Sequence, residues 1–240
     1  MWSALLVALA ALIGTGLVLW LPLPESGRVS SADGAVRVSG VWSPSAPPPT
    51  ITRFALSAFS AIMQKAYAVS ALPMSAPTPF KLTFAVPADL VGEAPVLYRY
   101  RPDLDAWQAY PAAASADGWT LSTSVGGQPA SVWGVGAAVS FTRPARARDV
   151  LSGLLAAPPP DAVGYEAYDA AVDAKGDAVL LSDPLDAGGC GGAFQLGRSA
   201  TVTSRDLPLP FGISYRVIVR WRLGDGCAPG EAVASAHPSP

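Results

Sequence analysis

The feature that most constrains this chain is its uncharged N-terminal segment. Between Trp2 and Trp20 there is no charged side chain, and the first ionisable side chain is that of Glu25. A helix over this segment would be about 28 Å long, close to the hydrocarbon thickness of a bilayer. Tryptophan at each end suits the headgroup interface. The sequence therefore predicts that residues 1–24 form a transmembrane anchor, with the membrane as the first partner of the chain.

A cleaved signal peptide is the alternative for the same segment, since alanine and leucine dominate residues 4–12. Two features favour an uncleaved anchor. No basic residue precedes the apolar run, and the stretch from Leu17 to Pro24 carries bulky residues instead of an Ala-x-Ala cleavage site. A buried core helix is disfavoured because the segment has no polar face.

The orientation of the anchor rests on weak charge signals, because only Glu25 and Arg28 follow it closely. We expect a single-pass protein whose ectodomain is extracellular or periplasmic, since the body is rich in predicted strands and contains two cysteines.

The composition favours one or two compact domains and argues against several classes of function. Half of the 240 residues are hydrophobic and 14% are charged, so a core can form. The net charge of -2 gives no concentrated positive field, and we expect no nucleic-acid partner. The single histidine, His237, lies in a Pro-rich tail, which leaves no histidine-based zinc site and no base for Ser-His-Asp or Cys-His catalysis. We therefore expect no metal, no cofactor and no enzymatic activity.

Patterns of alternation and turn residues predict an all-β body. Asp33 and Gly34 tolerate the positive φ of a tight hairpin between two extended runs. From Phe80 to Val86 apolar and polar residues alternate, as in a half-buried strand. Turn signals recur about every ten residues, which indicates a sandwich or barrel and not a βα fold. Further strands are predicted over residues 96–101, 106–110, 119–124, 131–139, 163–172, 177–181, 193–203 and 213–223.

The predicted organisation is a transmembrane helix followed by two small antiparallel β-sandwich domains, over residues 25–141 and 161–233. Residues 142–160 are Pro-rich and predict a semi-rigid linker, and residues 234–240 predict a disordered tail. Residues 54–66 are apolar and Ala-rich, but Arg53 and Lys65 disfavour a second membrane span. Either strands or a short helix fit that stretch.

Five short stretches of the first half follow one another in a recognisable order: Gly34 to Val38, Pro79 to Phe84, Leu97 to Tyr100, Trp107, and Ser131 to Trp133. In this order of features, the span from Gly27 to Ala137, a little under half of the chain, resembles the β-sandwich module shared by ankyrins, netrin receptors and zonula occludens proteins, with relatives in bacterial surface proteins. The resemblance implies a β-sandwich fold. Some members of that family cleave themselves at a His-Phe-Ser segment. Ser131 stands here after Pro129 and Ala130, so it lacks the base that such a nucleophile needs.

Two cysteines and a row of arginines are candidate functional groups in the second half. Cys190 and Cys227 are the only cysteines, and an oxidising compartment favours a disulfide between them over two free thiols. Alternation from Tyr215 to Leu223 places Arg216, Arg220 and Arg222 on one face of a strand. Such a row could hold an anionic polymer or lipid headgroups, whereas an ordinary solvated face neutralised by nearby Asp side chains is the plainer interpretation.

Acidic and glycine-rich clusters give weaker signals. Carboxylates at Asp103, Asp105, Asp169, Asp173, Asp177, Asp183 and Asp186 could bind calcium or act as a glycosidase pair. No EF-hand pattern is present, and Asp in such turns commonly hydrogen-bonds its own backbone. The run from Gly188 to Gly192 lacks the ending of a phosphate-binding loop and predicts a flexible turn.

Three hypotheses of function follow from these patterns. The first is a membrane-anchored surface or periplasmic protein with a structural, adhesion or assembly role, acting on another surface protein. The second is a module that binds a glycan or another envelope polymer through the arginine row or through stacking aromatic residues. The third is a carboxylate-dependent hydrolase. The candidate stacking residues are Tyr98, Tyr100, Trp107 and Trp119.

Overall fold

Strands make up most of the described chain. The computed structural model of the protein describes residues 25–43, 46–55, 63–74, 76, 78–139, 141–172, 178–181, 186–189, 200–209 and 213–224. Within these ranges the predominance of strands confirms the predicted all-β class. The predicted anchor over residues 1–24 lies outside them. Among the described residues, no helix has the length and apolar character needed to cross a membrane.

Two sheets face each other in the first half. The first sheet has the order β1 (Glu25–Ser30), β2 (Val36–Trp42), β5 (Phe80–Ala85), β9 (Thr120–Val125) and β8 (Ala113–Ala114). The second sheet includes the run β3 (Ile51–Phe54), β4 (Met63–Val69), β10 (Ser131–Gly136), β6 (Val96–Arg101) and β7 (Ala106–Tyr110). A short 3₁₀ helix, η2 (Ala88–Leu90), follows β5. Pairing within each run is antiparallel.

The predicted hairpin at Asp33-Gly34 is confirmed. Strands β1 and β2 pair on either side of it, and Gly34 has a φ of 69°, which an L side chain rarely adopts. The Asp33 carboxylate accepts hydrogen bonds from the Ser31 hydroxyl and the Ala35 amide, at 2.7 and 3.2 Å. These local contacts fix the register of the strands on both sides.

The core between the two sheets comes from the inward residues of each strand. Strand β5 alternates as predicted, with Phe80, Leu82 and Phe84 buried. From the opposite sheet Trp133 packs against Phe84, with ring centroids 6.1 Å apart. For residues 54–66 the sequence allows either strands or a short helix. In the structure this stretch is strand from Met63 onwards.

The C-terminal half contributes further strands. Strand β11 (Ala162–Val172) pairs along its length with β15 (Ser214–Leu223), and β14 (Ala200–Pro208) pairs with the other edge of β15. Two shorter strands, β12 (Ala178–Leu180) and β13 (Asp186–Gly189), pair with β11. The predicted turn at residues 188–192 therefore begins within a strand, while residues 190–192 lie outside the described ranges.

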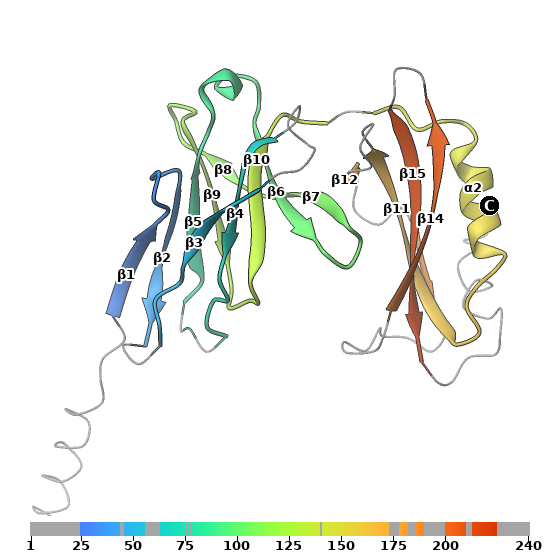
Figure 1. The fold of residues 1–240 in the computed structure, drawn as a ribbon, viewed down its shortest axis with the longest axis horizontal. Helices are drawn as coiled ribbons and strands as arrows, with labels where there is room; N and C mark the ends of the chain where they lie inside the picture. Colours follow the sequence, from blue (N-terminus) through green and yellow to red (C-terminus); the bar gives the residue numbers. More distant parts are fainter. Residues whose placement is uncertain are drawn as a thin grey trace, which may run out of the picture.

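Helix α2 (Ala147–Leu155) covers one face of the sheet formed by these C-terminal strands (Figure 1). Buried Ala147 and Leu151 pack against Tyr215, Val219 and Trp221. This helix lies in the stretch expected to be a linker. Within the described residues, the second half is therefore a sheet covered by a helix, and the predicted second sandwich is wrong. The apolar residues of the helix supply the layer that the other sheet of a sandwich would have supplied.

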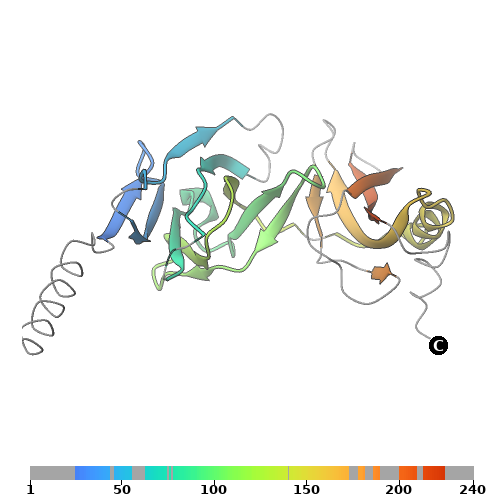
Figure 2. The same ribbon diagram turned by 90° about the horizontal axis from the view of Figure 1, so that it is seen from below.

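The two halves share one hydrogen-bonded sheet path. Strand β12 pairs in parallel with β7, through Ala178 opposite Ala106 and Val179 opposite Trp107. The resulting ten-stranded sheet runs from β14 to β3. Figure 2 shows the consequence: β1 and β2 lie at one end of the long axis and α2 at the other.

Candidate functional site

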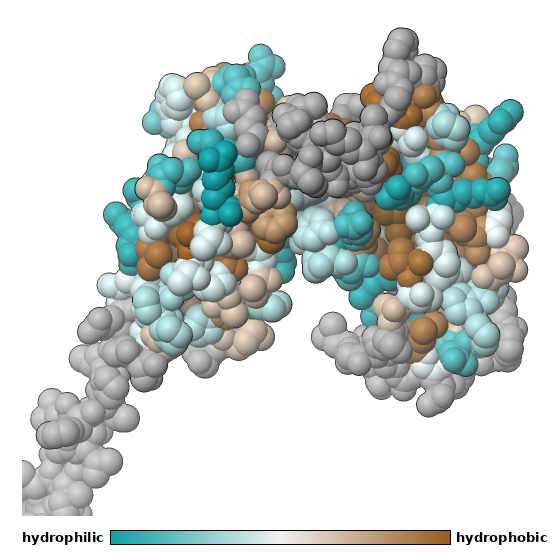
Figure 3. Space-filling view, viewed as in Figure 1, coloured by the Kyte–Doolittle hydropathy of each residue, from teal (hydrophilic) through white to brown (hydrophobic). Residues whose placement is uncertain are grey.

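The arginine row lies where the two halves meet. Its three guanidinium groups project from β15 on the face opposite to α2, since Tyr215, Val217, Val219 and Trp221 take the helix side. The same face carries Ile218, which belongs to a buried cluster with Leu104 of the first half. The face that we considered for external anions is therefore turned toward the chain's own β6–β7 hairpin. Figure 3 shows hydrophilic surface at this junction, with an open notch beneath it.

Each arginine of the row is paired with a carboxylate. Arg216 donates two hydrogen bonds to Asp206 of β14, at 2.6 and 3.0 Å. Arg220 and Arg222 both donate to Glu166 of β11, at 3.1 and 2.6 Å. Adjacent strands thus supply the partners, since register places Asp206 opposite Arg216 and Glu166 opposite Arg220. Acidic residues neutralise the face as expected, but Glu166 is one of them, and the face packs against the β6–β7 hairpin instead of being solvated.

The tip of the β6–β7 hairpin adds a carboxylate from the other half of the molecule. Asp103 lies 3.4 Å from Arg220 Nε and accepts two hydrogen bonds from Arg101, at 2.8 and 2.7 Å. The hydroxyl of Tyr100 donates to Asp105. Between the two acids Leu104 is only 4% exposed. We call residues 102–105 the hairpin tip: an apolar side chain flanked by two carboxylates, seated on the arginine row.

The electrostatics of the junction favour its charged form. The hydrogen bonds from Arg101, followed by its charge and that of Arg220, hold the pKa of Asp103 below its usual value against a partial burial that acts to raise it. Partial burial also acts to raise the pKa of Glu166, but hydrogen bonds from Arg222 and Arg220 outweigh it and hold that pKa low. Both carboxylates are therefore ionised at neutral pH, and attraction joins the halves.

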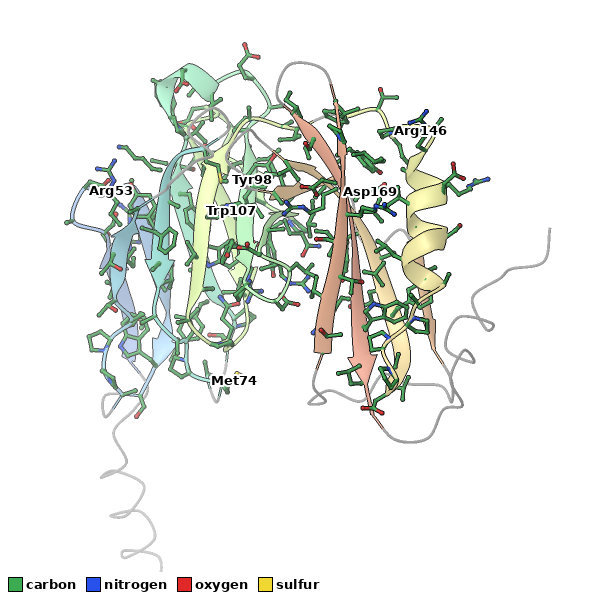
Figure 4. All side chains as sticks on the ribbon, turned by 45° about the vertical axis from the view of Figure 1, so that its right-hand side comes forward. Arg53, Met74, Tyr98, Trp107, Arg146 and Asp169 are labelled. Carbon is green, nitrogen blue, oxygen red and sulfur yellow. The ribbon has the colours of Figure 1, made fainter. Side chains whose placement is uncertain are left out.

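The four candidate stacking residues do not form a common surface. Tyr98 and Trp107 are 2% and 5% exposed, so neither can offer a ring face to a glycan. They lie on neighbouring strands inside the molecule (Figure 4), and the Tyr98 hydroxyl donates to the Ala137 carbonyl oxygen at 2.8 Å. Tyr100 is half-buried with its ring against that of Trp107. Trp119 alone is largely exposed, at 51%. Strand alternation could not separate these cases, because the residues that bury Tyr98 and Trp107 come from strands distant in sequence: Met63, Ala66 and Val179.

The acidic residues that we considered for calcium or hydrolysis are dispersed where they can be seen. Asp103 and Asp105 belong to the hairpin tip, and Asp169 lies on β11 near Arg143, with Oδ2 and Nε 3.3 Å apart. No group of three or more His, Cys, Asp or Glu side chains suited to a metal occurs in the described part of the chain. The remaining candidates, Asp173, Asp177 and Asp183, and the side chain of Asp186, lie outside the described part.

The hydroxyl of Ser131 has a structural set of contacts. It accepts hydrogen bonds from the Trp133 indole at 2.8 Å and from the Gln128 side-chain amide at 3.3 Å. Buried beside a core tryptophan, it holds that ring in place. The candidate disulfide between Cys190 and Cys227, and His237, lie outside the described residues.

Comparison of the chain with protein-family models, with curated proteins and with solved structures gives no match.

Proposed function

We propose that this protein is a membrane-anchored, extracytoplasmic β-protein with a structural, adhesion or assembly role and no enzymatic activity. The observation that carries the proposal is that the arginine row forms ion pairs within the chain. Arg216, Arg220 and Arg222 pair with carboxylates of the chain itself. A charged face of this kind, neutralised by carboxylates of the same chain, stabilises an arrangement of the two halves instead of holding a substrate.

The geometry supports a role as a spacer. The two halves are joined by the parallel β7–β12 pairing, by buried Leu104 and by the Asp103–Arg220 ion pair. Contacts of three kinds across one junction restrict bending between the halves. Strand β1, which begins directly after the proposed anchor, lies at one end of the long axis (Figure 2). A body held at one end can present its far end at a set distance from the membrane.

A relationship of the first half to the ankyrin, netrin-receptor and zonula occludens module is part of this proposal. The two facing sheets over residues 25–136 are compatible with it, and such a module suits an assembly role. Self-cleavage is not part of the proposal, because Ser131 is engaged by Trp133 and Gln128.

Binding of a glycan or envelope polymer is the alternative, and Trp119 is the observation that favours it. Its ring is half-exposed, and an exposed aromatic ring of this kind can stack on the face of a sugar. Retention of the wild-type protein on a glycan array, lost in Trp119→Ala and unchanged in Tyr110→Phe, would favour this alternative over the structural role.

The proposed topology is tested by fractionation and cysteine labelling of intact cells. We expect the full-length protein in the membrane fraction after carbonate washing. A membrane-impermeant maleimide should label Cys190 and Cys227 only after reduction, because an oxidising compartment favours their disulfide. A freely soluble cytosolic protein with both thiols reduced would overturn the proposal.

A further inference from the structure

A cavity of about 410 Å³ opens at one end of the first sandwich, between its two sheets. Its floor is apolar and comes from buried Tyr67, Phe84, Val86 and Val135, which continue the core of the sandwich to the surface. Volumes of a few hundred Å³ with mainly apolar walls are typical of sites for small ligands. The cavity is separate from the arginine row, since none of the residues of the junction lines it.

A fixed carboxylate, that of Asp33, lies beside three lining residues of the cavity, Ala35, Lys65 and Tyr67. Asp33 accepts hydrogen bonds from the Tyr67 hydroxyl at 2.6 Å, from the Ser31 hydroxyl at 2.7 Å and from the Ala35 amide at 3.2 Å. These contacts, led by that of Tyr67, lower the pKa of Asp33 to about 2. Asp33 is therefore ionised at neutral pH, and its hydrogen bonds hold the Tyr67 side chain of the lining in place.

Lys65 is the lining group with hydrogen-bonding capacity to spare. It shares the inward face of β4 with Tyr67, but its position near the strand end leaves it 47% exposed. Its Nζ lies 4.0 Å from Asp33 Oδ2, which is beyond hydrogen-bonding distance. An ammonium has three donors. The other charged lining residue, Asp89, is already engaged in a contact of its own.

We propose that this cavity binds a small amphipathic carboxylate. The apolar part of such a ligand would lie on Phe84, Val86 and Val135, and its carboxylate would accept hydrogen bonds from Lys65 at the mouth. Hydrogen bonds between charged partners are stronger than neutral ones, so the ammonium favours an anionic head over a neutral one of the same shape. This proposal is independent of the anchor and of the spacer role.

The test uses full-length protein in lipid nanodiscs and three probes that share one body: 3-(4-fluorophenyl)propionate, the matching alcohol and the matching amine. Fluorine NMR titration measures each affinity, with empty nanodiscs as the background. We expect the wild type to bind the propionate more tightly than the alcohol, and the amine most weakly. Lys65→Met should weaken propionate binding about tenfold, the loss of one charge-assisted contact, and leave the alcohol unchanged.

Two further variants control the result. Lys81→Met removes an ammonium from the outward face of β5 and should leave all three affinities unchanged. Ala88→Trp places a large ring at the exposed rim of the cavity and should weaken the propionate and the alcohol alike. The proposal is overturned if the wild type binds no probe up to the solubility limit, if the amine binds as well as the propionate, or if Lys65→Met and Lys81→Met have equal effects.

Discussion

Among single residues, the adjacent glycines Gly126 and Gly127 differ sharply in the space around them. A Cβ atom on Gly127 would lie 2.3 Å from the carbonyl oxygen of Pro73 and 2.3 Å from the Cα atom of Met74. A Cβ atom on Gly126 would meet nothing within 4 Å. Since the atoms crowding Gly127 belong to backbone, they cannot move aside as a side chain could.

Gly127→Ala should lower the free energy of unfolding by about 2 to 3 kcal/mol, as overpacking does. The added methyl group would force apart the bridge in which Leu72 and Gln128 exchange hydrogen bonds of 2.8 and 3.1 Å. Gly126→Ala is the matched control and should shift stability by less than about 1 kcal/mol, in the stabilising direction. Urea unfolding measures both variants. Equal stabilities would show that the two backbones do not pass as closely as described.

Asp169 is a buried carboxyl group whose ionisation opposes folding. It is 4% exposed, and its Oδ1 has no hydrogen-bond partner among the described residues. Burial raises the pKa of Asp169, while the nearby Tyr215 hydroxyl and Arg143 guanidinium oppose only part of that rise. The folded protein therefore holds this proton more tightly than the unfolded chain does.

Asp169→Asn should make the protein more stable at pH 7 than the wild type. Because the folded pKa is raised, the unfavourable contribution is absent below the unfolded pKa and develops as the pH rises through the folded pKa. The difference between the variant and the wild type should therefore shrink as the pH falls through the raised folded pKa, and its pH-dependent part should be gone below about pH 4, the ordinary pKa of an unfolded Asp. Unfolding curves at several pH values give this difference, and a gap that widens in acid would contradict the assigned direction.

Among elements, helix α2 has a clear amphipathic pattern, but the flanking prolines led to the prediction of a linker. Its apolar residues recur at the spacing of an amphipathic helix, and all of them pack on the C-terminal strands: Ala147, Val150, Leu151, Leu154 and Leu155. Pro144 and the prolines from 158 to 160 bracket the segment and predict a linker. The helix nevertheless forms, since burial of its apolar stripe outweighs the local preference for extended chain.

Leu151→Ala should lower the free energy of unfolding by about 2 to 5 kcal/mol, the usual range for a buried leucine. The loss should be concentrated in the second half, because Leu151 contacts the cluster that includes Tyr215 and Trp221. Amide hydrogen exchange would report faster exchange in β15 than in β5. The exposed neighbour Ser152→Ala is the control and should change neither strand.

Strand signals were strong where alternation was uninterrupted, and they failed where partners come from outside the local sequence. The hairpin at Asp33 and strand β5 could be predicted because turn chemistry and period-two alternation are local properties. The two-residue parallel contact of β12 with β7 has no local signature, since it depends on how the halves meet. Tyr98 and Trp107 were expected on a surface for the same reason: the residues that bury them are distant in sequence.

For the whole molecule, the hairpin tip on the arginine row determines how the halves are held. Of the candidate site, the sequence predicted the common face of Arg216, Arg220 and Arg222, because that follows from alternation. It could not predict that Asp103 and Leu104 of the first half would occupy part of this face. That contact is made between residues more than a hundred positions apart.

The Asp103–Arg220 contact can be measured by a double-mutant cycle. With side chains partly exposed at 35% and 23%, we expect a coupling energy of about 0.5 to 1 kcal/mol between Asp103→Ala and Arg220→Ala. Arg216→Ala combined with Asp103→Ala is the control and should give less coupling, since Arg216 pairs with Asp206. A coupling energy of zero for the first pair would mean that this ion pair does not help to join the halves.

The most direct test of the central claim, that the two halves form one rigid body, is the distribution of distances between them. Spin labels attached to p-acetylphenylalanine at the exposed positions Ser124 and Ser152 would report on the first sheet and on α2 without involving the cysteines. Pulsed electron paramagnetic resonance should give one narrow distribution for the full-length protein, and a broad one after Leu104→Asp. A broad distribution in the otherwise unchanged protein would contradict the account.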